Sequence, residues 1–303
     1  MNEALYQYVC DLVGNENVLK KEPMSRHTTF RVGGDAEYML LVPDKDVMVQ
    51  LVKRFHQLEV PYYVIGNGSN ILVGDKGIEG FVLNTSAKMK EIQVDGEYIT
   101  VESGAMLAKV AAVARDQGLT GLEFASGIPG TVGGAIVMNA GAYDGEMKQV
   151  VESVTVVSAE GEIMELDNST MEFGYRTSII KNRPFIVLET VLKLSKGDQN
   201  EIQAKMDDFT ARRREKQPLE YPSAGSTFKR PEGHFAGKLI MDAGLRGFRV
   251  GGAQVSEKHC GFIINIGNAS ATDIAELIDE VTERVKEKFN VSLEPEIIKI
   301  GEF

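Results

Sequence analysis

The sequence is poor in the residues that build metal centres and disulfide bonds. Its 303 residues include only two cysteines and four histidines, and none of them is spaced as a metal-binding motif. Zinc catalysis therefore has no basis in the sequence. We expect a reducing environment, with Cys10 and Cys260 as small buried apolar residues and His56 on the surface of a helix.

Long hydrophobic runs are also missing. No apolar segment approaches the ~20 residues that a membrane-spanning helix needs, and residues 1–4 lack the basic start of a signal peptide. The net charge of −11 disfavours nucleic-acid binding, which requires a basic face. We therefore expect a cytoplasmic protein that binds neither membranes nor nucleic acid, while its oligomeric state, monomer or larger, stays open.

Three catalytic or nucleotide-binding motifs are absent as well. No Gly-x-Ser-x-Gly elbow supports a hydrolase triad. Gly66 and Gly68 are not followed by the Gly-Lys-Ser/Thr of a Walker loop, and they lack the third glycine of a Rossmann fingerprint. The chain after them also has the pattern of a strand rather than a helix.

Glycine is nevertheless concentrated in two segments. The first is Gly66–Asn70, between apolar runs at 62–65 and 71–73, and the second, at 125–143, contains five glycines. Glycine adopts backbone angles closed to other residues, and successive N–H groups can cradle phosphate oxygens. Either segment alone is better explained by a turn or by close backbone packing. Two of them flanked by strands favour a dinucleotide between them.

Apolar periodicity predicts an α+β fold. A helix at 3–13 precedes a strand near 36–42, and Pro43 and Asp44 end that strand and begin a second helix. The length predicts two or three subdomains, because a single hydrophobic core rarely grows this large. Further strands are expected at 88–94, 98–103, 150–157, 163–166 and 185–194, and further helices at 106–117, at 200–216 and after Ser270.

The region after residue 199 combines a basic helix end with an unusual loop. The predicted helix ends in Arg212-Arg213-Arg214-Glu215-Lys216, which fits a solvated helix end and an anion-binding funnel equally well. The loop at 221–231 is rich in small residues and basic at its exit. The C-terminal run at 293–300 has the pattern of a strand that carries a carboxylate.

Six different short motifs occur in order along the chain. They lie at Thr29–Gly34, Gly66–Asn70, Gly127–Gly141, Phe173–Arg176, Ser223–Lys229 and Glu294–Glu296. Their order and spacing resemble the UDP-N-acetylenolpyruvoylglucosamine reductase family over essentially the whole chain. The resemblance implies a two-subdomain FAD-binding fold of the vanillyl-alcohol-oxidase (PCMH) type plus an α+β substrate-binding domain. Together with pattern changes near 85 and 200, it predicts FAD-binding subdomains at 1–85 and 86–199, a C-terminal return at 292–303, and a substrate-binding domain at 200–291.

The resemblance implies a flavoprotein oxidoreductase of peptidoglycan synthesis. NADPH reduces FAD, and UDP-N-acetylglucosamine enolpyruvate is then reduced to UDP-N-acetylmuramate. Neither glycine segment contains a histidine, so we expect FAD to be bound non-covalently. The interval between Arg176 and Ser226 is compact, as in the shorter class of the family, which lacks an extra substrate loop. Another FAD oxidoreductase on the same fold, or a non-catalytic flavin or nucleotide-sugar sensor, is the alternative.

The same resemblance assigns three catalytic roles. Arg176 stabilises the enolate beside the substrate carboxylate, Glu296 is its partner, and Ser226 is a buried donor of the proton. Without the resemblance, an ion-pair arginine, a surface-strand glutamate and a turn serine would explain these residues. Substrate binding is expected at Tyr175, Lys216 and Arg230, and contact with FAD at Gly66, Asn67, Gly68, Ser69, Asn70, Ser126, Gly127, Ile128, Pro129, Thr131, Gly133, Gly134, Asn139 and Ala140.

Overall fold

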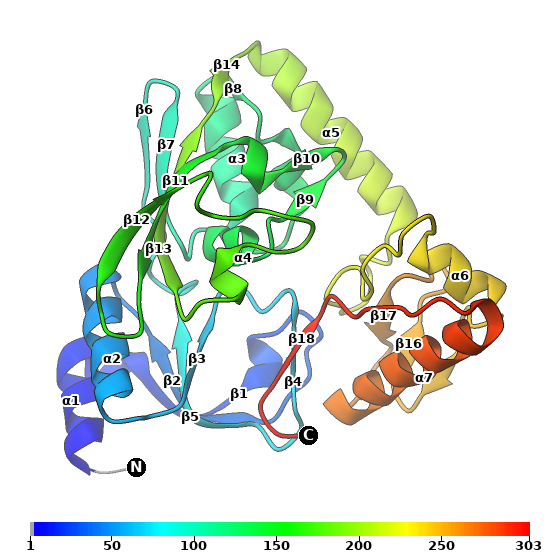
Figure 1. Ribbon diagram of the computed structural model, residues 1–303, viewed down its shortest axis with the longest axis horizontal. Coiled ribbons are helices and arrows are strands. Elements are labelled where there is room, and N and C mark those ends of the chain that lie inside the picture. Colours follow the sequence, from blue (N-terminus) through cyan, green and yellow to red (C-terminus); the bar gives the residue numbers. More distant parts are fainter. Residues whose placement is uncertain (1–2) are drawn as a thin grey trace. The chain divides into compact units, whose positions relative to one another are not determined.

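The computed structural model describes residues 3–303 and contains two compact units (Figure 1). Unit 1 comprises residues 3–20, 38–67 and 80–212, and unit 2 comprises residues 21–37, 68–79 and 213–303. Buried side chains form two hydrophobic cores in unit 1 and one in unit 2. None of the helices within residues 3–303 has an apolar stretch long enough to cross a bilayer. The domain boundaries at 85, 199 and 291 stay predictions.

The first core of unit 1 is covered by two helices, α1 (Glu3–Val13) and α2 (Lys45–Gln57), which lie side by side in Figure 1. Asp44 begins α2, because its carboxylate accepts a hydrogen bond of 2.9 Å from the Val47 N–H. The predicted helix at 3–13, the strand near 36–42 and the helix start at Asp44 are confirmed. A four-stranded sheet has the order β1 (Val18–Pro23), β2 (Asp35–Leu41), β5 (Ile78–Asn84) and β3 (Tyr62–Ile65).

The second core of unit 1 lies against an antiparallel sheet and the helix α3 (Leu107–Asp116). The sheet has the order β12 (Ile163–Asp167), β11 (Val151–Val157), β13 (Ile186–Lys193), β7 (Tyr98–Glu102) and β6 (Ile92–Asp95). These strands were predicted, but β6 begins at Ile92 and not at residue 88. The Met89 N–H donates to Thr85 O at 3.1 Å, so residues 85–89 form a turn before the strand.

Several short elements connect the sheets of unit 1. The glycine-rich segment at 125–143 contains the helix α4 (Val132–Val137), which no pattern in the sequence predicted. A hairpin follows, formed by β9 (Gly141–Ala142) and β10 (Gly145–Glu146). The remaining elements of unit 1 are β8 (Leu119–Thr120), β14 (Ser195–Lys196), and 3₁₀ helices at Asn15–Asn17, Glu123–Gly127, Met147–Gln149 and Ile179–Lys181. The helix α5 (Gln199–Lys216) begins in unit 1 and ends in unit 2, and a further 3₁₀ helix at Met24–Arg26 belongs to unit 2.

Unit 2 packs two helices on a small antiparallel sheet. The long helix α7 (Ala271–Phe289) begins as predicted at Ser270, whose side chain forms a reciprocal capping box with Asp273. Its predicted inner face, from Ile274 to Val285, is buried in the core. The other elements are α6 (Ala236–Asp242), β15 (Arg249–Val250), β16 (Ala253–Val255), β17 (Ile263–Asn265), and a parallel pair of β4 (Ile71–Val73) and β18 (Ile298–Ile300).

Three predictions about single residues can be compared with this fold. Cys10 and Cys260 are both buried, and His56 is exposed on α2, as expected. The C-terminal strand is shorter than predicted, because only Ile298–Ile300 pairs with β4. Glu296 therefore precedes the strand, where its side chain is half-buried.

Candidate functional site

The two glycine segments touch one another within unit 1. A side chain on Gly66 would overlap the Thr131 hydroxyl oxygen, and Asn67 Nδ2 donates to Pro129 O at 2.6 Å. Glycine at position 66 therefore allows a contact that any larger residue would prevent. The two segments therefore lie in direct contact, and the prediction that a dinucleotide binds between them stays a prediction.

The second segment is anchored on the backbone that precedes α3. Val132 and Gly133 donate their N–H groups to Ala105 O and Ser103 O, at 2.9 and 2.8 Å. Thr131 caps α4, with its hydroxyl 3.4 Å from the Gly134 N–H. Within residues 3–303 the N–H groups of Gly130 and Thr131 have no acceptor. In this segment, small residues therefore lie next to backbone N–H groups that could still donate a hydrogen bond.

Within unit 2, the second half of the first loop packs closely on the segment around His27. Gly68 has a φ of +61°, and a side chain there would overlap His27 O. The N–H groups of Gly68, Ser69 and Asn70 donate to no other group among residues 3–303. Consecutive unused N–H donors of this kind can bind the oxygens of a phosphate.

Asn70 links this loop to the C-terminal segment of unit 2. Its Nδ2 donates to Glu296 O at 3.1 Å, and its own carbonyl accepts from the Ile298 N–H at 3.0 Å. The side chain and the backbone of Asn70 therefore fix the chain on both sides of Ile297. No sequence pattern indicated that the first glycine loop would hold Glu296.

Arg176 lies in a tight turn of unit 1. The Gly174 and Thr177 backbones bond to each other, and Arg176 between them has a φ of +56°. Residues other than glycine rarely adopt this backbone conformation, and those that do cluster at functional sites. The Arg176 Nη2 donates to Gly141 O at 3.2 Å, and its guanidinium lies 5.3 Å from the ring centre of Tyr175.

Asn139 holds this turn from the second glycine segment. The residue is 1% exposed, and its Nδ2 donates to Glu146 Oε2 at 3.1 Å and to Gly174 O at 3.0 Å. Its Oδ1 accepts from the Lys148 N–H at 2.9 Å. The side chain of Asn139 is thus bonded inside the protein, and its contact with FAD stays a prediction, as does that of Ala140.

The 3₁₀ helix at Glu123–Gly127 depends on a residue that the sequence did not single out. The buried Glu123 carboxylate accepts from Thr120 Oγ1 at 2.5 Å and from the Gly121 N–H at 2.8 Å. Burial raises the pKa of this carboxyl, but the hydrogen bonds outweigh burial and hold the pKa below its ordinary value. Because Ser126 Oγ donates to Glu123 O at 2.8 Å, Glu123 also positions the start of the predicted FAD segment.

Ser226 and Glu296 lie on neighbouring segments of unit 2. Phe228 and Pro295 form an isolated antiparallel bridge, and the Glu296 N–H donates to Thr227 O at 2.8 Å. Ser226 was expected to be buried, but the structure leaves it exposed beside this bridge. The role of Ser226 as a proton donor stays a prediction.

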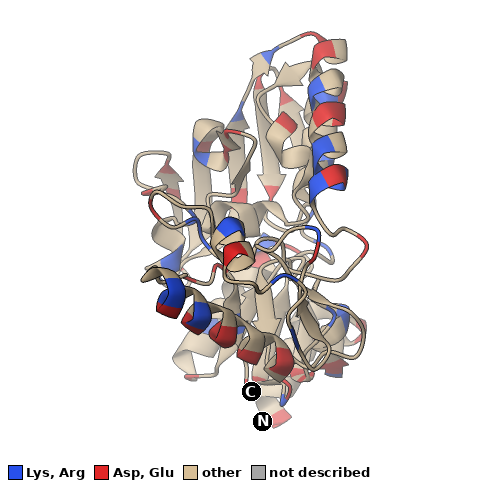
Figure 2. Cartoon of the chain, turned by 90° about the vertical axis from the view of Figure 1, so that its right-hand side faces the viewer, with Lys and Arg blue, Asp and Glu red and all other residues tan. Residues whose placement is uncertain are grey.

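The two cations predicted to bind substrate, Lys216 and Arg230, are exposed. Lys216 is the last residue of α5, a helix along which basic and acidic residues are mixed in Figure 2. Arg230 stacks on Phe235, with its guanidinium 4.0 Å from the ring centre, and its Nε donates to His234 O at 3.3 Å. Tyr175 is likewise accessible, with 56% of its surface exposed. Their contacts with substrate stay predictions.

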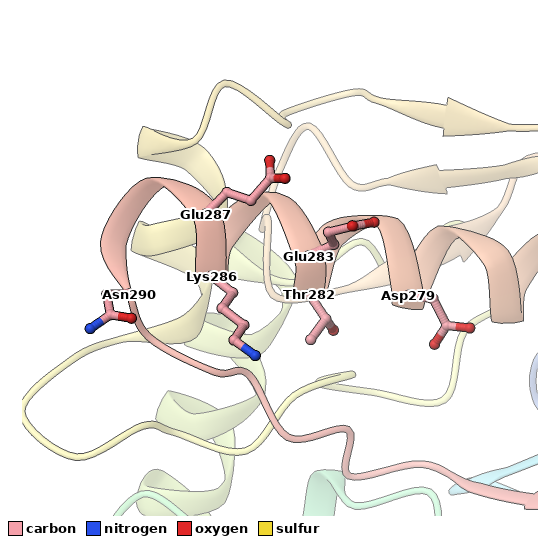
Figure 3. A pocket seen from close by; sticks show the side chains of 6 residues that line it. All are labelled: Asp279, Thr282, Glu283, Lys286, Glu287 and Asn290. Atoms are coloured by element: carbon pink, nitrogen blue, oxygen red, sulfur yellow. The ribbon is translucent and has the colours of Figure 1, made fainter.

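A hollow of about 550 Å³ on α7 contains none of the predicted residues. The six side chains in Figure 3 all project from this one helix and its end, namely Asp279, Thr282, Glu283, Lys286, Glu287 and Asn290. Within residues 3–303 no group of three or more His, Cys, Asp or Glu side chains is placed to hold a metal ion. The glycine segments and the Ser226–Glu296 region are therefore the stronger candidates.

Comparison with known proteins gives matches to both regions. Residues 36–167 match the family described as FAD binding domain, and residues 217–300 match the C-terminal domain of UDP-N-acetylenolpyruvoylglucosamine reductase. The chain is 50% identical to the UDP-N-acetylenolpyruvoylglucosamine reductase of Agathobacter rectalis, over 100% of both proteins. It is 49% identical to the enzyme of that name from Caldanaerobacter subterraneus subsp. tengcongensis, again over 100% of both.

Solved structures agree with these matches. The crystal structure of UDP-N-acetylenolpyruvylglucosamine reductase from Thermus caldophilus has a TM-score of 0.80 and 35% identity, and it covers 93% of this chain and 97% of that one. The glucose dehydrogenase Phl p 4.0202 shares the fold alone, with a TM-score of 0.52 and 16% identity over 65% of this chain and 45% of that one.

The matched FAD-binding domain and the fold define an FAD-dependent oxidoreductase with the FAD-binding fold of the vanillyl-alcohol-oxidase (PCMH) type. Within that class, the chain belongs to the UDP-N-acetylenolpyruvoylglucosamine reductase family. Enzymes of this family use NADPH as the reductant and act in peptidoglycan synthesis.

Proposed function

We propose that this chain reduces UDP-N-acetylglucosamine enolpyruvate to UDP-N-acetylmuramate in the cytoplasm, with Arg176, Glu296 and Ser226 as its catalytic residues. The observation that carries the proposal is the backbone bond between Glu296 and Thr227, which fixes Glu296 beside the loop of Ser226. Asn70 joins the segment of Glu296 to a glycine loop suited to a nucleotide. If Ser226 were only a turn residue and Glu296 only a surface residue, nothing would require their two segments to be bonded together.

The residues of the two glycine segments fit a dinucleotide. In this proposal the unused N–H groups of Gly68, Ser69 and Asn70 donate to the FAD pyrophosphate. Gly130 and Thr131 offer two further donors beside the cofactor. When bound, FAD takes up electrons from NADPH and supplies hydride to the substrate, while the protein supplies placement and electrostatics.

Arg176 and Glu296 act on the substrate carboxylate. Hydride reaches the enol carbon remote from that carboxylate, so negative charge accumulates on the carbon next to it. A fixed guanidinium there stabilises the transition state more than the ground state, and its planar fork suits a carboxylate. Glu296 orients Arg176 or, when protonated, donates to the carboxylate. Tyr175, Lys216 and Arg230 bind the rest of the substrate, the two cations through its diphosphate.

Ser226 supplies the proton that completes the reaction. A serine hydroxyl is a weak acid, but the carbon beside the substrate carboxylate is a strong enough base to take its proton when the two are held together. Gly225 has a φ of +77°, a backbone conformation that favours glycine and lets the Ser226 loop approach its substrate closely. The exposure of Ser226 leaves its hydroxyl accessible to a ligand.

The variant Ser226→Ala tests this role. We expect it to bind FAD and to be reduced by NADPH at the wild-type rate, because neither step uses the hydroxyl. Reoxidation by UDP-N-acetylglucosamine enolpyruvate should be slower by a factor on the order of 10²–10⁴, the usual contribution of a general acid. Stopped-flow absorbance of the flavin measures both half-reactions, and wild-type reoxidation in the variant would remove Ser226 from the mechanism.

A further inference from the structure

Thr227, the residue after Ser226, has the most complete set of hydrogen bonds around the proposed proton donor. It is buried, with 0% of its surface exposed. Its N–H donates to Gly261 O at 2.8 Å, and its hydroxyl oxygen accepts from the Ile263 N–H at 3.0 Å. Its carbonyl accepts from the Glu296 N–H at 2.8 Å. One side chain and its backbone thus join three segments of unit 2.

The segment that receives the Thr227 N–H is itself fixed. Gly261 donates its N–H to His259 Nδ1 at 3.1 Å, and the Phe262 N–H donates to His259 O at 2.9 Å. Burial lowers the pKa of His259 and so favours the neutral ring, whose Nδ1 can accept a hydrogen bond. The His259 ring also packs edge-on against Phe262, with ring centres 4.9 Å apart. Thr227 is therefore bonded to a well-ordered turn.

Ser226 has no comparable support of its own. The residue is exposed, and its hydroxyl forms no hydrogen bond within residues 3–303. The position of that hydroxyl is consequently set by the backbone on either side. On one side is Gly225, where an added side chain would meet only open space, and on the other is Thr227.

We infer that Thr227 is a positioning residue, which holds the Ser226 hydroxyl in line for proton transfer through the bond between its own hydroxyl and the Ile263 N–H. This inference rests on the proposed function, because it assumes that Ser226 gives the proton. Correct placement of a reacting group is worth much of its catalytic effect, and a displacement of about 1 Å can cost on the order of 100-fold in rate.

Two substitutions at Thr227 separate the effect of its hydroxyl from the effect of its side-chain volume. Thr227→Val keeps the shape but leaves the buried Ile263 N–H without an acceptor, and Thr227→Ser keeps the acceptor. Thr190→Val is a matched control, because Thr190 is also 0% exposed and its hydroxyl has no partner within residues 3–303. It lies on β13 of unit 1, away from the proposed catalytic residues in sequence and in unit.

The experiment compares both half-reactions of these holoenzymes by stopped-flow absorbance, in H₂O and in D₂O. For Thr227→Val we expect reduction by NADPH and the KM for the enolpyruvyl substrate to stay within about twofold of wild type. The maximal rate of reoxidation should fall by about 10- to 100-fold, with a larger solvent isotope effect because proton transfer becomes slower. Thr227→Ser should recover most of that rate, and Thr190→Val should reoxidise as wild type does.

Three outcomes would overturn the inference. Wild-type reoxidation in Thr227→Val, or equal losses in Thr227→Ser and Thr227→Val, would show that the hydroxyl does not position Ser226. Equal slowing of both half-reactions would mean a general structural effect. Ser226→Ala, run beside them, keeps the two proposals distinct: slow Ser226→Ala with normal Thr227→Val overturns only the role of Thr227, whereas normal Ser226→Ala overturns the role of Ser226 itself.

Discussion

At the scale of a single residue, Gly66 determines how closely the two glycine segments approach one another. The loop comes so close to Thr131 that even one methyl group would overlap the hydroxyl oxygen. The same closeness lets Asn67 reach Pro129 O. The absence of a side chain thus brings two stretches far apart in the sequence into direct contact.

Gly66→Ala should therefore lower both the stability of the protein and its affinity for FAD. Forcing one methyl group into a packed contact costs about 1–3 kcal/mol. Urea denaturation of the apoprotein measures the free energy of unfolding, and fluorescence titration measures FAD binding. Gly134→Ala is the control for stability, since its nearest contact would be an ordinary 3.6 Å and alanine favours the helix α4. Equal free energies of unfolding for Gly66→Ala and wild type would contradict the close contact between Gly66 and Thr131.

Single residues were predictable from the sequence when they belong to a contiguous motif. Gly66, Arg176 and Ser226 were singled out in this way, and their functional roles stay predictions. Glu123 and Thr227 were not, because their importance depends on hydrogen-bond partners that only the folded chain brings near them. The burial of Ser226 was predicted wrongly, since a loop of small residues gives no signal that separates an open position from a closed one.

At the scale of an element, α7 depends on a carboxylate outside the helix. Asp75, two residues after β4, accepts from the Ala271 N–H at 2.7 Å and from the N–H and hydroxyl of Thr272 at 2.9 and 2.7 Å. Burial raises the pKa of Asp75, but these hydrogen bonds outweigh burial and lower the pKa. The N-terminus of a helix also favours negative charge.

Asp75→Ala should destabilise the protein by roughly 1 kcal/mol at neutral pH, the usual effect of losing such a cap. The pKa of Asp75 is lower in the folded state than in the unfolded state, so its contribution is present above the unfolded pKa of about 3.9. It is lost as the pH falls through the folded pKa. Denaturation of wild type and variant between neutral and acidic pH should show the difference shrink.

Asp279→Ala is the control for this prediction, because Asp279 is exposed on the same helix and only 3.8 Å from Lys299 in a surface ion pair. Its free energy of unfolding should stay within about 0.5 kcal/mol of wild type. A constant difference between Asp75→Ala and wild type at every pH would contradict the assignment of the effect to the charge of Asp75.

Elements with strong local signals were predicted well, and those with tertiary causes were missed. The helix after Ser270 has a capping box and a regular apolar face, both visible in the sequence. The helix α4 has two glycines in six residues, so its intrinsic propensity is low. It forms because Thr131 caps it and because Val132 and Gly133 bond to the backbone at Ala105 and Ser103.

At the scale of the whole molecule, the proposed catalytic residues come from both compact units. Arg176 belongs to unit 1, and Ser226 and Glu296 belong to unit 2. The sequence motifs predicted the family and its cofactor, and the matches to FAD-binding and C-terminal domains confirm them. The catalytic roles of these residues stay predictions, and a measurement of the reaction tests them.

The most direct test is an anaerobic absorption spectrum of the FAD-loaded protein followed through two additions. NADPH should bleach the bands of the oxidised flavin, and UDP-N-acetylglucosamine enolpyruvate should then restore them in proportion to the UDP-N-acetylmuramate formed. Bleaching without recovery would leave an FAD protein with a different substrate. Failure to bind or bleach FAD at saturating concentration would contradict the assignment of the two glycine segments to the cofactor.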